Sequence, residues 1–202
     1  RIKVAATAAA MRSEGVEIGD RVVAWVPNVT EYVIYGLGAL SIGAVVSTAS
    51  PDFAPHAVED RFGQIEPKIF LAADGYHYNG KYFDCSEKSA EIEKLLPTLV
   101  KTVRVSEFEA WIAPFMGAKA VFERLPFDHP GFVLFSSGTT GKPKCITHSG
   151  AGVMLKAQSE MLYQFNINKG QKVFFFTTCG WMMWNWLTMA LGRGATIVLF
   201  DG

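Results

Sequence analysis

Disulfides, zinc sites and charged interfaces find little support in this sequence. Its three cysteines, Cys85, Cys145 and Cys179, are scattered and show no CxxC spacing. We therefore expect no disulfide framework, no structural zinc and a reducing compartment, the cytosol. The four histidines lie far apart without an HxxxH pair, so no metal-ligating residues are predicted. The 19 basic and 19 acidic side chains cancel, which gives no electrostatic reason to expect nucleic-acid binding.

Neither a secretory signal nor a membrane span is indicated. The first 15 residues carry four charged side chains and no long apolar run. Residues 32–51 and 173–192 lack charge, and each is about the ~20 residues that a spanning helix needs. Each divides into a helix-like part and a strand-like part, which favours buried elements of a sheet over a span. The chain does not begin with methionine, and we expect it to be a piece of a longer protein.

Strand and helix patterns alternate in the first half of the chain. The expected strands are 21–27, 44–50, 68–74 and 100–105. The expected helices are 30–43 with Thr30 as N-cap, 54–66, and 86–99 beginning at Ser86 or Ser89. Repeated steps of this length predict an α/β fold with a mostly parallel sheet flanked by helices. Residues 107–130 interrupt the rhythm and are expected at the surface.

The second half continues the pattern around a glycine-rich loop. Strands are expected at 131–137, 144–149, 172–178 and 195–202, with a helix over 150–165. No repeat, low-complexity stretch or clear linker interrupts the chain. We therefore predict one continuous α/β unit, in which residues 1–130 form an N-terminal portion and residues 131–202 a portion that carries the loop.

The loop itself combines groups that bind anions. Glycine lets backbone N–H groups converge on phosphate oxygens, while hydroxyls and lysines add donors and positive charge. The residues are Ser136, Ser137, Gly138, Thr139, Thr140, Gly141, Lys142 and Lys144. This set favours a polyphosphate ligand, although a hairpin turn uses the same residue types.

A Walker A loop does not fit the spacing. Counted from Gly138, the positions that need a second glycine and a Ser/Thr hold Pro143 and Cys145. If Gly141 and Lys142 are instead taken as the Gly-Lys pair of the motif, the position that needs a Ser/Thr holds Pro143. A Walker loop also opens a helix, whereas this loop is predicted to run from strand to strand. A P-loop phosphotransferase is therefore only a distant alternative.

The stretch "FSSGTTGKPK" resembles the phosphate-binding signature of the adenylate-forming superfamily, which includes acyl-CoA synthetases. The resemblance extends to "GDRVVAWVPNVTEYVIYGLGALSIGAVVSTASPDF" and "DHP". It implies that the eight loop residues bind ATP phosphates, with Thr139 and Lys144 catalytic, and that Mg²⁺ and CoA also take part. It further implies that residues 1–202 are an incomplete N-terminal AMP-binding domain. The Tyr-Gly-x-Thr-Glu motif, the ribose-binding aspartate and the C-terminal domain are expected downstream, so the fragment alone is expected to be inactive.

The stretch "TTCGWMMWNW" bears on the substrate. Three tryptophans and two methionines form either plain core or an apolar pocket wall, and helical spacing lets Trp181 and Trp184 share a face. The stretch resembles that of the acetoacetate-activating members of the superfamily. This implies acetoacetate as substrate and Trp181, Met182 and Met183 as pocket residues. Asn185 either donates to a keto oxygen or satisfies buried backbone. An acetyl- or propionyl-activating enzyme, and a non-catalytic folding unit, remain alternatives.

Other polar residues are weaker candidates for ligand binding. Lys81, after Gly80, matches a basic residue that contacts a CoA phosphate in acetyl-CoA synthetases. His148 either approaches the nucleotide or acyl pocket or helps Ser149 begin the next helix. Adenylation and thioester formation need no protein nucleophile, so Cys145 and Cys179 are expected to be buried and inert.

Overall fold

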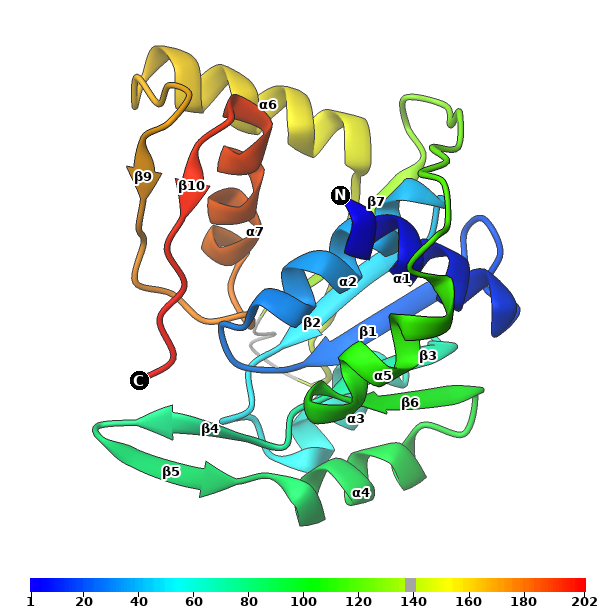
Figure 1. Cartoon of the computed structure of the whole chain (residues 1–202). Helices are drawn as coiled ribbons and strands as arrows, with labels where there is room; N and C mark the ends of the chain where they lie inside the picture. Colours follow the sequence, from blue (N-terminus) through cyan, green and yellow to red (C-terminus); the bar gives the residue numbers. More distant parts are fainter. Residues whose placement is uncertain (137–140) are drawn as a thin grey trace.

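A six-stranded sheet forms the centre of the protein, in the order β6–β3–β1–β2–β7–β8 (Figure 1). The computed structural model describes residues 1–136 and 141–202. The strands are β1 (Arg21–Trp25), β2 (Val45–Ala49), β3 (Ile69–Ala72), β6 (Lys101–Arg104), β7 (Pro130–Ser136) and β8 (Lys144–Ser149). Neighbouring strands are parallel except β8, which runs antiparallel to β7. The predicted α/β fold with a mostly parallel sheet is confirmed.

Helices cover both faces of this sheet, which explains why its strands are continuously apolar. One face packs on α1 (Ile2–Ser13), α2 (Thr30–Ser41) and α5 (Phe108–Ile112), and the other packs on α3 (Pro55–Phe62) and α4 (Ser86–Leu95). The residues of β1 alternate accordingly. Val22 and Ala24 point into the first core cluster, whereas Val23 and Trp25 point into the second.

Smaller elements lie beside the sheet. They are the antiparallel hairpin β4 (Gly75–Tyr78) and β5 (Lys81–Asp84), the parallel pair β9 (Lys172–Val173) and β10 (Thr196–Ile197), α6 (Gly150–Tyr163), α7 (Met182–Met189), and 3₁₀ turns Val105–Glu107, Ala113–Phe115 and Ala190–Arg193. Figure 1 shows α6, α7, β9 and β10 grouped at one side of the sheet. The C-terminal segment returns to the hairpin, where His77 Nδ1 lies 3.2 Å from Asp201 Oδ2.

Several boundaries differ from those predicted. Thr30 is not the N-cap of α2: Val29 takes that position, and the Thr30 hydroxyl donates to Glu31 instead. The strands expected at 172–178 and 195–202 shrink to two paired residues each, because β9 and β10 pair only with one another within the described chain. Beyond Val173, the side chains of residues 174–176 are exposed.

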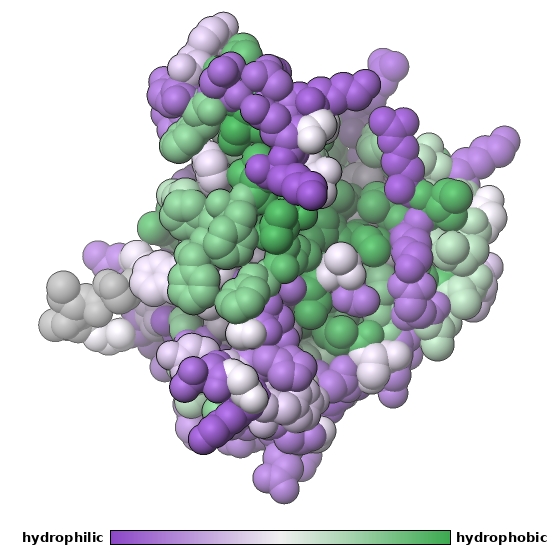
Figure 2. Space-filling view, turned by 60° about the vertical axis from the view of Figure 1, so that its left-hand side comes forward, coloured by the Kyte–Doolittle hydropathy of each residue, from purple (hydrophilic) through white to green (hydrophobic). Residues whose placement is uncertain are grey.

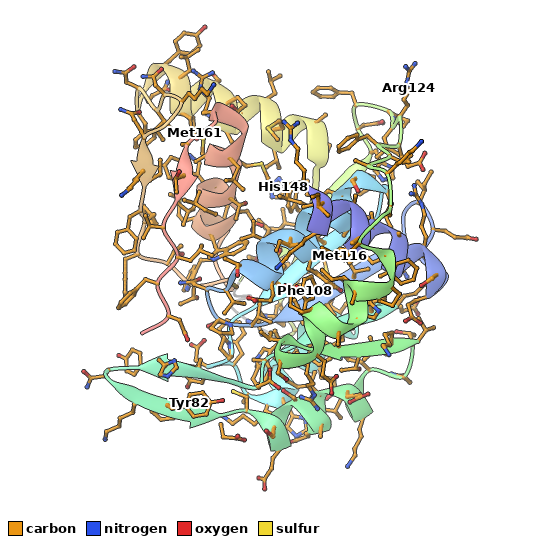
Figure 3. All side chains as sticks on the ribbon, viewed as in Figure 1. Tyr82, Phe108, Met116, Arg124, His148 and Met161 are labelled. Atoms are coloured by element: carbon orange, nitrogen blue, oxygen red, sulfur yellow. The ribbon has the colours of Figure 1, made fainter. Side chains whose placement is uncertain are left out.

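The prediction that residues 107–130 lie at the surface is wrong at its start. Phe108 and Ile112 are fully buried, because their i, i+4 spacing places both on the inner face of α5. From residue 116 to residue 129 the side chains are largely exposed, as expected. Figure 3 shows Phe108 on α5 against the sheet.

Helix α1 was not predicted from the sequence. Its buried residues are mostly alanines, so hydrophobic and polar positions differ little and no amphipathic period stands out. Small side chains instead let two helices approach closely. At Gly38 of α2, a Cβ atom would lie 2.9 Å from the Thr7 side chain of α1. Within the described residues, none of the helices combines the length and apolar character that crossing a bilayer requires.

Replacing Phe108 with alanine tests the corrected core. Because Phe108 is fully buried among α1, α5 and the sheet, Phe108→Ala is expected to lower the free energy of unfolding by about 3–5 kcal/mol. Phe122, which is 72% exposed, supplies the matched control, and Phe122→Ala is expected to change stability by less than about 0.5 kcal/mol. Urea unfolding followed by tryptophan fluorescence compares them, and equal effects would contradict this placement of α5.

Candidate functional site

Three parallel strands deliver loops to one edge of the sheet. Because β1, β2 and β7 run in the same direction, their carboxyl ends meet there, which is where ligands bind in open α/β sheets. Asn28 follows β1, the turn 50–53 follows β2, and the glycine-rich loop follows β7. This edge therefore gathers segments that lie more than 80 residues apart.

The segment 177–181 is fixed across this edge by side-chain hydrogen bonds. Asn28 Nδ2 donates to the carbonyl oxygens of Thr177 and Phe200, each at 2.8 Å. The buried hydroxyl of Thr48 donates to the carbonyl of Cys179 at 2.6 Å. The bonds to Thr177 and Cys179 tie the part of the chain that leads into α7 to residues at the ends of β1 and β2, whereas the bond to Phe200 ties down the C-terminal segment.

Gly180 lets this segment approach the turn after β2. A Cβ atom at this position would lie 3.3 Å from Phe53 Cζ and 3.4 Å from the Ser50 backbone nitrogen. The distance to Phe53 is tighter than ordinary van der Waals contact, and the distance to Ser50 N is at its lower limit, against backbone that cannot rotate away. Close packing therefore explains why position 180 is a glycine.

Trp184 anchors α7 on α2. Its side chain is 1% exposed, and its ring centroid lies 4.5 Å from that of Tyr32. Burial raises the pKa of Tyr32 well above its ordinary value, and the Cys179 thiol raises it further, so the phenol stays neutral. The expected common face of Trp181 and Trp184 is wrong: Trp181 precedes the helix as its N-cap and is 66% exposed.

A cavity of about 580 Å³ lies between β7, β8, α6 and α7, and we call it the α6–α7 cavity. Most of its wall is apolar. The apolar residues are Phe132, Leu134, Val153, Ala157, Phe165, Met182, Met183 and Trp186. The volume and composition are those of a small-molecule site with few polar groups. Figure 2 turns this side forward and shows hydrophobic side chains gathered across the middle of the face, between hydrophilic regions.

Asn185 and His148 contribute polar groups to the α6–α7 cavity. Asn185 is only 6% exposed, and its Nδ2 is buried without a hydrogen-bond partner in the described chain. Native proteins rarely leave such donors unpaired, and the Asn185 side chain belongs to the wall of this cavity. His148 lines the same cavity, while the cap of α6 is made by Ser149 Oγ, which accepts from Gly152 N at 3.1 Å. The structure thus brings Met182, Met183, Asn185 and His148 together, and leaves Trp181 outside.

The described part of the glycine-rich loop lies at the same sheet edge. Ser136 and Lys144 are direct cross-strand neighbours at its base, and Gly141 has φ +100°, a conformation that favours glycine. The predicted passage from strand to strand is confirmed, because β7 and β8 form an antiparallel pair. Ser137, Gly138, Thr139 and Thr140 lie outside the described residues.

Helix α3 and the turn that follows it contact the descending limb of this loop. Gln64 Nε2 donates to the carbonyl oxygens of Pro143 (2.9 Å) and Asp60 (2.6 Å), and the Cys145 thiol lies 3.6 Å from Gln64 Oε1. Lys142 Nζ lies 3.9 Å from Asp60 Oδ1. The sequence offered no signal for these contacts, since they join an exposed face of α3 to the loop across about 80 residues.

Lys81 lies elsewhere, on the exposed β4–β5 hairpin opposite Tyr78, and it does not line the α6–α7 cavity. Of the hairpin side chains, Tyr82 is labelled in Figure 3. Over the described residues no group of three or more His, Cys, Asp or Glu side chains is arranged to hold a metal ion.

The cysteines divide into two buried and one exposed. Cys179 is buried as expected, but the prediction that Cys145 is buried is wrong, because β8 is an edge strand with an exposed surface at Cys145. Burial raises the pKa of the Cys85 thiol to about 11 and that of Cys179 well above its ordinary value. Neither of these two buried sulfurs is a thiolate near neutral pH.

The parallel sheet with helices on both faces, and the strand–loop–strand unit at its carboxyl edge, define an α/β domain of the adenylate-forming class. A family model described as "AMP-binding enzyme" matches residues 1–202, so the chain belongs to that family.

Curated relatives and a solved structure agree with this assignment. The chain is 45% identical to an acetoacetyl-coenzyme A synthetase of Rhizobium meliloti (strain 1021), over 96% of this chain and 32% of the relative. It is 43% identical to an acetoacetyl-CoA synthetase of Gallus gallus, over 100% and 33%. The structure of acetoacetyl-CoA synthetase from Streptomyces lividans superposes with a TM-score of 0.95 at 38% identity, over 100% of this chain and 32% of that one. The chain spans about a third of the length of the curated relatives it matches.

Thiol labelling tests the cysteine environments. At pH 8 a disulfide reagent such as Ellman's is expected to modify Cys145 rapidly and the other two cysteines only after denaturation. The rate at Cys145 is expected to rise with pH, because burial also raises its pKa and the thiolate is the reactive form. Rapid modification of Cys85 or Cys179 in the folded chain would contradict their burial, and Cys145→Ser serves as the control.

Proposed function

We propose that this chain forms the phosphate- and acyl-binding portion of an acetoacetate–CoA ligase. The single observation that carries this proposal is Asn185, whose side chain lines the α6–α7 cavity and whose buried Nδ2 has no hydrogen-bond partner among the described residues. With its carboxylate at the α-phosphorus of ATP, an unsubstituted short acid has no further acceptor for that donor, whereas the keto oxygen of acetoacetate accepts its hydrogen bond. The similarity to acetoacetyl-CoA synthetases supports the same substrate.

ATP would bind at the carboxyl edge of β7. The Ser136 hydroxyl and the Lys144 ammonium stand side by side at the base of the loop, and both donate hydrogen bonds to anions. We assign the phosphates to Ser136, Ser137, Gly138, Thr139, Thr140, Gly141, Lys142 and Lys144, with Thr139 and Lys144 contacting the reacting phosphates. Mg²⁺ would be carried mainly by ATP oxygens and neutralise their charge, which fits a described chain without a three-residue acidic cluster.

The reaction would proceed in two half-reactions. The carboxylate of acetoacetate attacks the α-phosphorus of ATP, which forms acetoacetyl-adenylate and releases pyrophosphate. The CoA thiol, after losing its proton, then attacks the activated carbonyl, which forms acetoacetyl-CoA and releases AMP. The residues of this chain orient the reactants and neutralise charge, with Met182, Met183, Asn185 and the exposed Trp181 on the acyl side and Lys81 at a CoA phosphate. We further propose a cytosolic setting.

The domain assignment belongs to the same proposal. Residues 1–130 would supply the sheet edge, residues 131–202 the phosphate loop and acyl wall, and a C-terminal domain of the complete protein the remaining groups. Residues 1–202 alone are therefore expected to give no acid-dependent ATP–pyrophosphate exchange, whereas the complete protein gives it. Turnover by residues 1–202 alone would overturn this division of labour.

Substrate choice by the complete protein tests the proposal. Pyrophosphate release is measured with acetoacetate, acetate, propionate and butyrate, and we expect kcat/KM to be highest with acetoacetate. The physical reason is that only acetoacetate pairs with the buried Asn185 donor, and a site built around a hydrogen bond can reject analogues lacking it by several orders of magnitude. Equal or better kcat/KM with acetate would show that the chain belongs to a different short-chain ligase.

The contact between α3 and the loop provides a separate test of the ATP site. Gln64→Ala removes the donor that holds Pro143, so the KM for ATP is expected to rise by about 3- to 10-fold, corresponding to a lost hydrogen bond of about 1 kcal/mol. The KM for acetoacetate is expected to stay unchanged. Glu59→Ala, which lies on the preceding helix α3 and pairs with His56 rather than with the loop, is the control. Equal changes in both KM values would exclude a specific role for Gln64.

A further inference from the structure

The α6–α7 cavity is too large to select a four-carbon acid by shape alone. Its volume of about 580 Å³ falls within the range for drug-sized ligands, and one methylene in an apolar pocket changes specificity by only about 10- to 200-fold. Strong discrimination among short acids therefore has to come from polar groups. Besides Asn185, the wall carries His148, Gln164, and the Lys156–Glu160 pair, whose charged atoms lie 2.8 Å apart.

His148 differs from the other polar groups in its position. Lys156 and Glu160 lie on α6 and satisfy one another, and Gln164 is the C-cap of the same helix. His148 comes from β8, where it stands opposite Phe132 on the sheet side of the cavity, and Figure 3 shows it where β8 leads into α6. Asn185 comes from α7. Two donors thus reach one cavity from two different elements.

Among the described residues, no structural role explains why a histidine stands at position 148. Across residues 1–136 and 141–202 its nitrogens make no hydrogen bond or ion pair with protein groups, and the cap of α6 is supplied by its neighbour Ser149. Its ring is half-buried, in an apolar wall of Phe132, Leu134 and Val153. An imidazole in such a wall presents at least one N–H donor to whatever occupies the cavity.

We propose that His148 is a specificity-determining residue that recognises the ketone of the acyl group together with Asn185. This inference rests on the proposed function and names a second donor for its substrate. A ketone oxygen has two lone pairs and accepts one hydrogen bond from Asn185 Nδ2 and one from the imidazole. Butyrate has the same chain length but no ketone, so its binding leaves both donors unpaired inside an apolar cavity.

The test compares acetoacetate with butyrate in the complete protein. His148→Leu is expected to lower kcat/KM for acetoacetate by about 10- to 100-fold, the effect of one lost substrate hydrogen bond in a buried site. The kcat/KM for butyrate is expected to change by less than about 3-fold. His148→Gln, which keeps an N–H donor, is expected to restore most of the preference. Thr147→Val, one residue earlier on the exposed side of β8, is the matched control and is expected to leave both values unchanged.

A double variant adds a check that a purely structural role would not pass. If both side chains bind one oxygen, His148→Leu combined with Asn185→Leu is expected to lose less than the product of the single losses. Should His148→Leu fail to fold, His148→Met fills the same space and replaces it in every comparison.

The outcomes separate the inference from the function on which it rests. A wild-type protein that prefers butyrate or acetate refutes the proposed function, and the inference with it. A wild-type protein that prefers acetoacetate, with variants that lose activity equally on both acids, refutes only the role of His148. Selective loss with acetoacetate, rescued by glutamine, supports both.

Discussion

The hydrogen bond from Thr48 to the carbonyl of Cys179 joins the two parts of the candidate site. Thr48 belongs to β2, in the middle of the sheet, and Cys179 lies in the segment that leads into α7. Because the bond is buried, losing the hydroxyl would leave a carbonyl without a partner in a dry environment, which costs about 1–3 kcal/mol. Asn28 makes one further bond to this segment, at the Thr177 carbonyl, and another to the Phe200 carbonyl in the C-terminal segment. The orientation of α7, and with it the wall of the α6–α7 cavity, depends on these contacts.

Packing around this hydrogen bond also fixes residues that line the α6–α7 cavity. Gly180 permits backbone of the segment to lie against Ser50, and Trp184 packs on the neutral Tyr32 of α2. Once the segment is fixed, Asn185 has little freedom, because its neighbours Trp184 and Trp186 are both buried. The unpaired amide is therefore held in place by aromatic packing before any ligand arrives. Such prior organisation lowers the entropic cost of recognising a small acid.

The fold was largely predictable from the sequence, and the reasons are local. Apolar runs of β1, β2 and β3 separated by helical patterns specify a parallel sheet, because only strands covered on both faces are so uniformly hydrophobic. Helix α1 was not predicted, because its buried residues are mostly alanines, which show little contrast in hydropathy with the exposed positions. The burial of Phe108 and Ile112 was not predicted, because a five-residue helix is too short to show a hydrophobic period.

The candidate site was predictable only in part. The motifs identified the loop and "GWMMWNW", but a motif does not say which of its side chains turn inward. Trp181 faces outward because α7 begins after it, whereas Asn185 faces the cavity three residues into the helix. The contributions of His148 and of Gln64 depend on contacts between strands and helices far apart in the chain, which no local pattern encodes.

We propose that the α6–α7 cavity receives the acyl group while the loop after β7 receives the phosphates. A crystal structure of the complete protein with an acyl-sulfamate analogue of acetoacetyl-adenylate tests this most directly. We expect the ketone oxygen within about 3.2 Å of Asn185 Nδ2, a hydrogen-bond distance, and the sulfamate beside Ser136 and Lys144. An analogue whose acyl chain lies outside the cavity, without a hydrogen bond to Asn185, would refute this proposal.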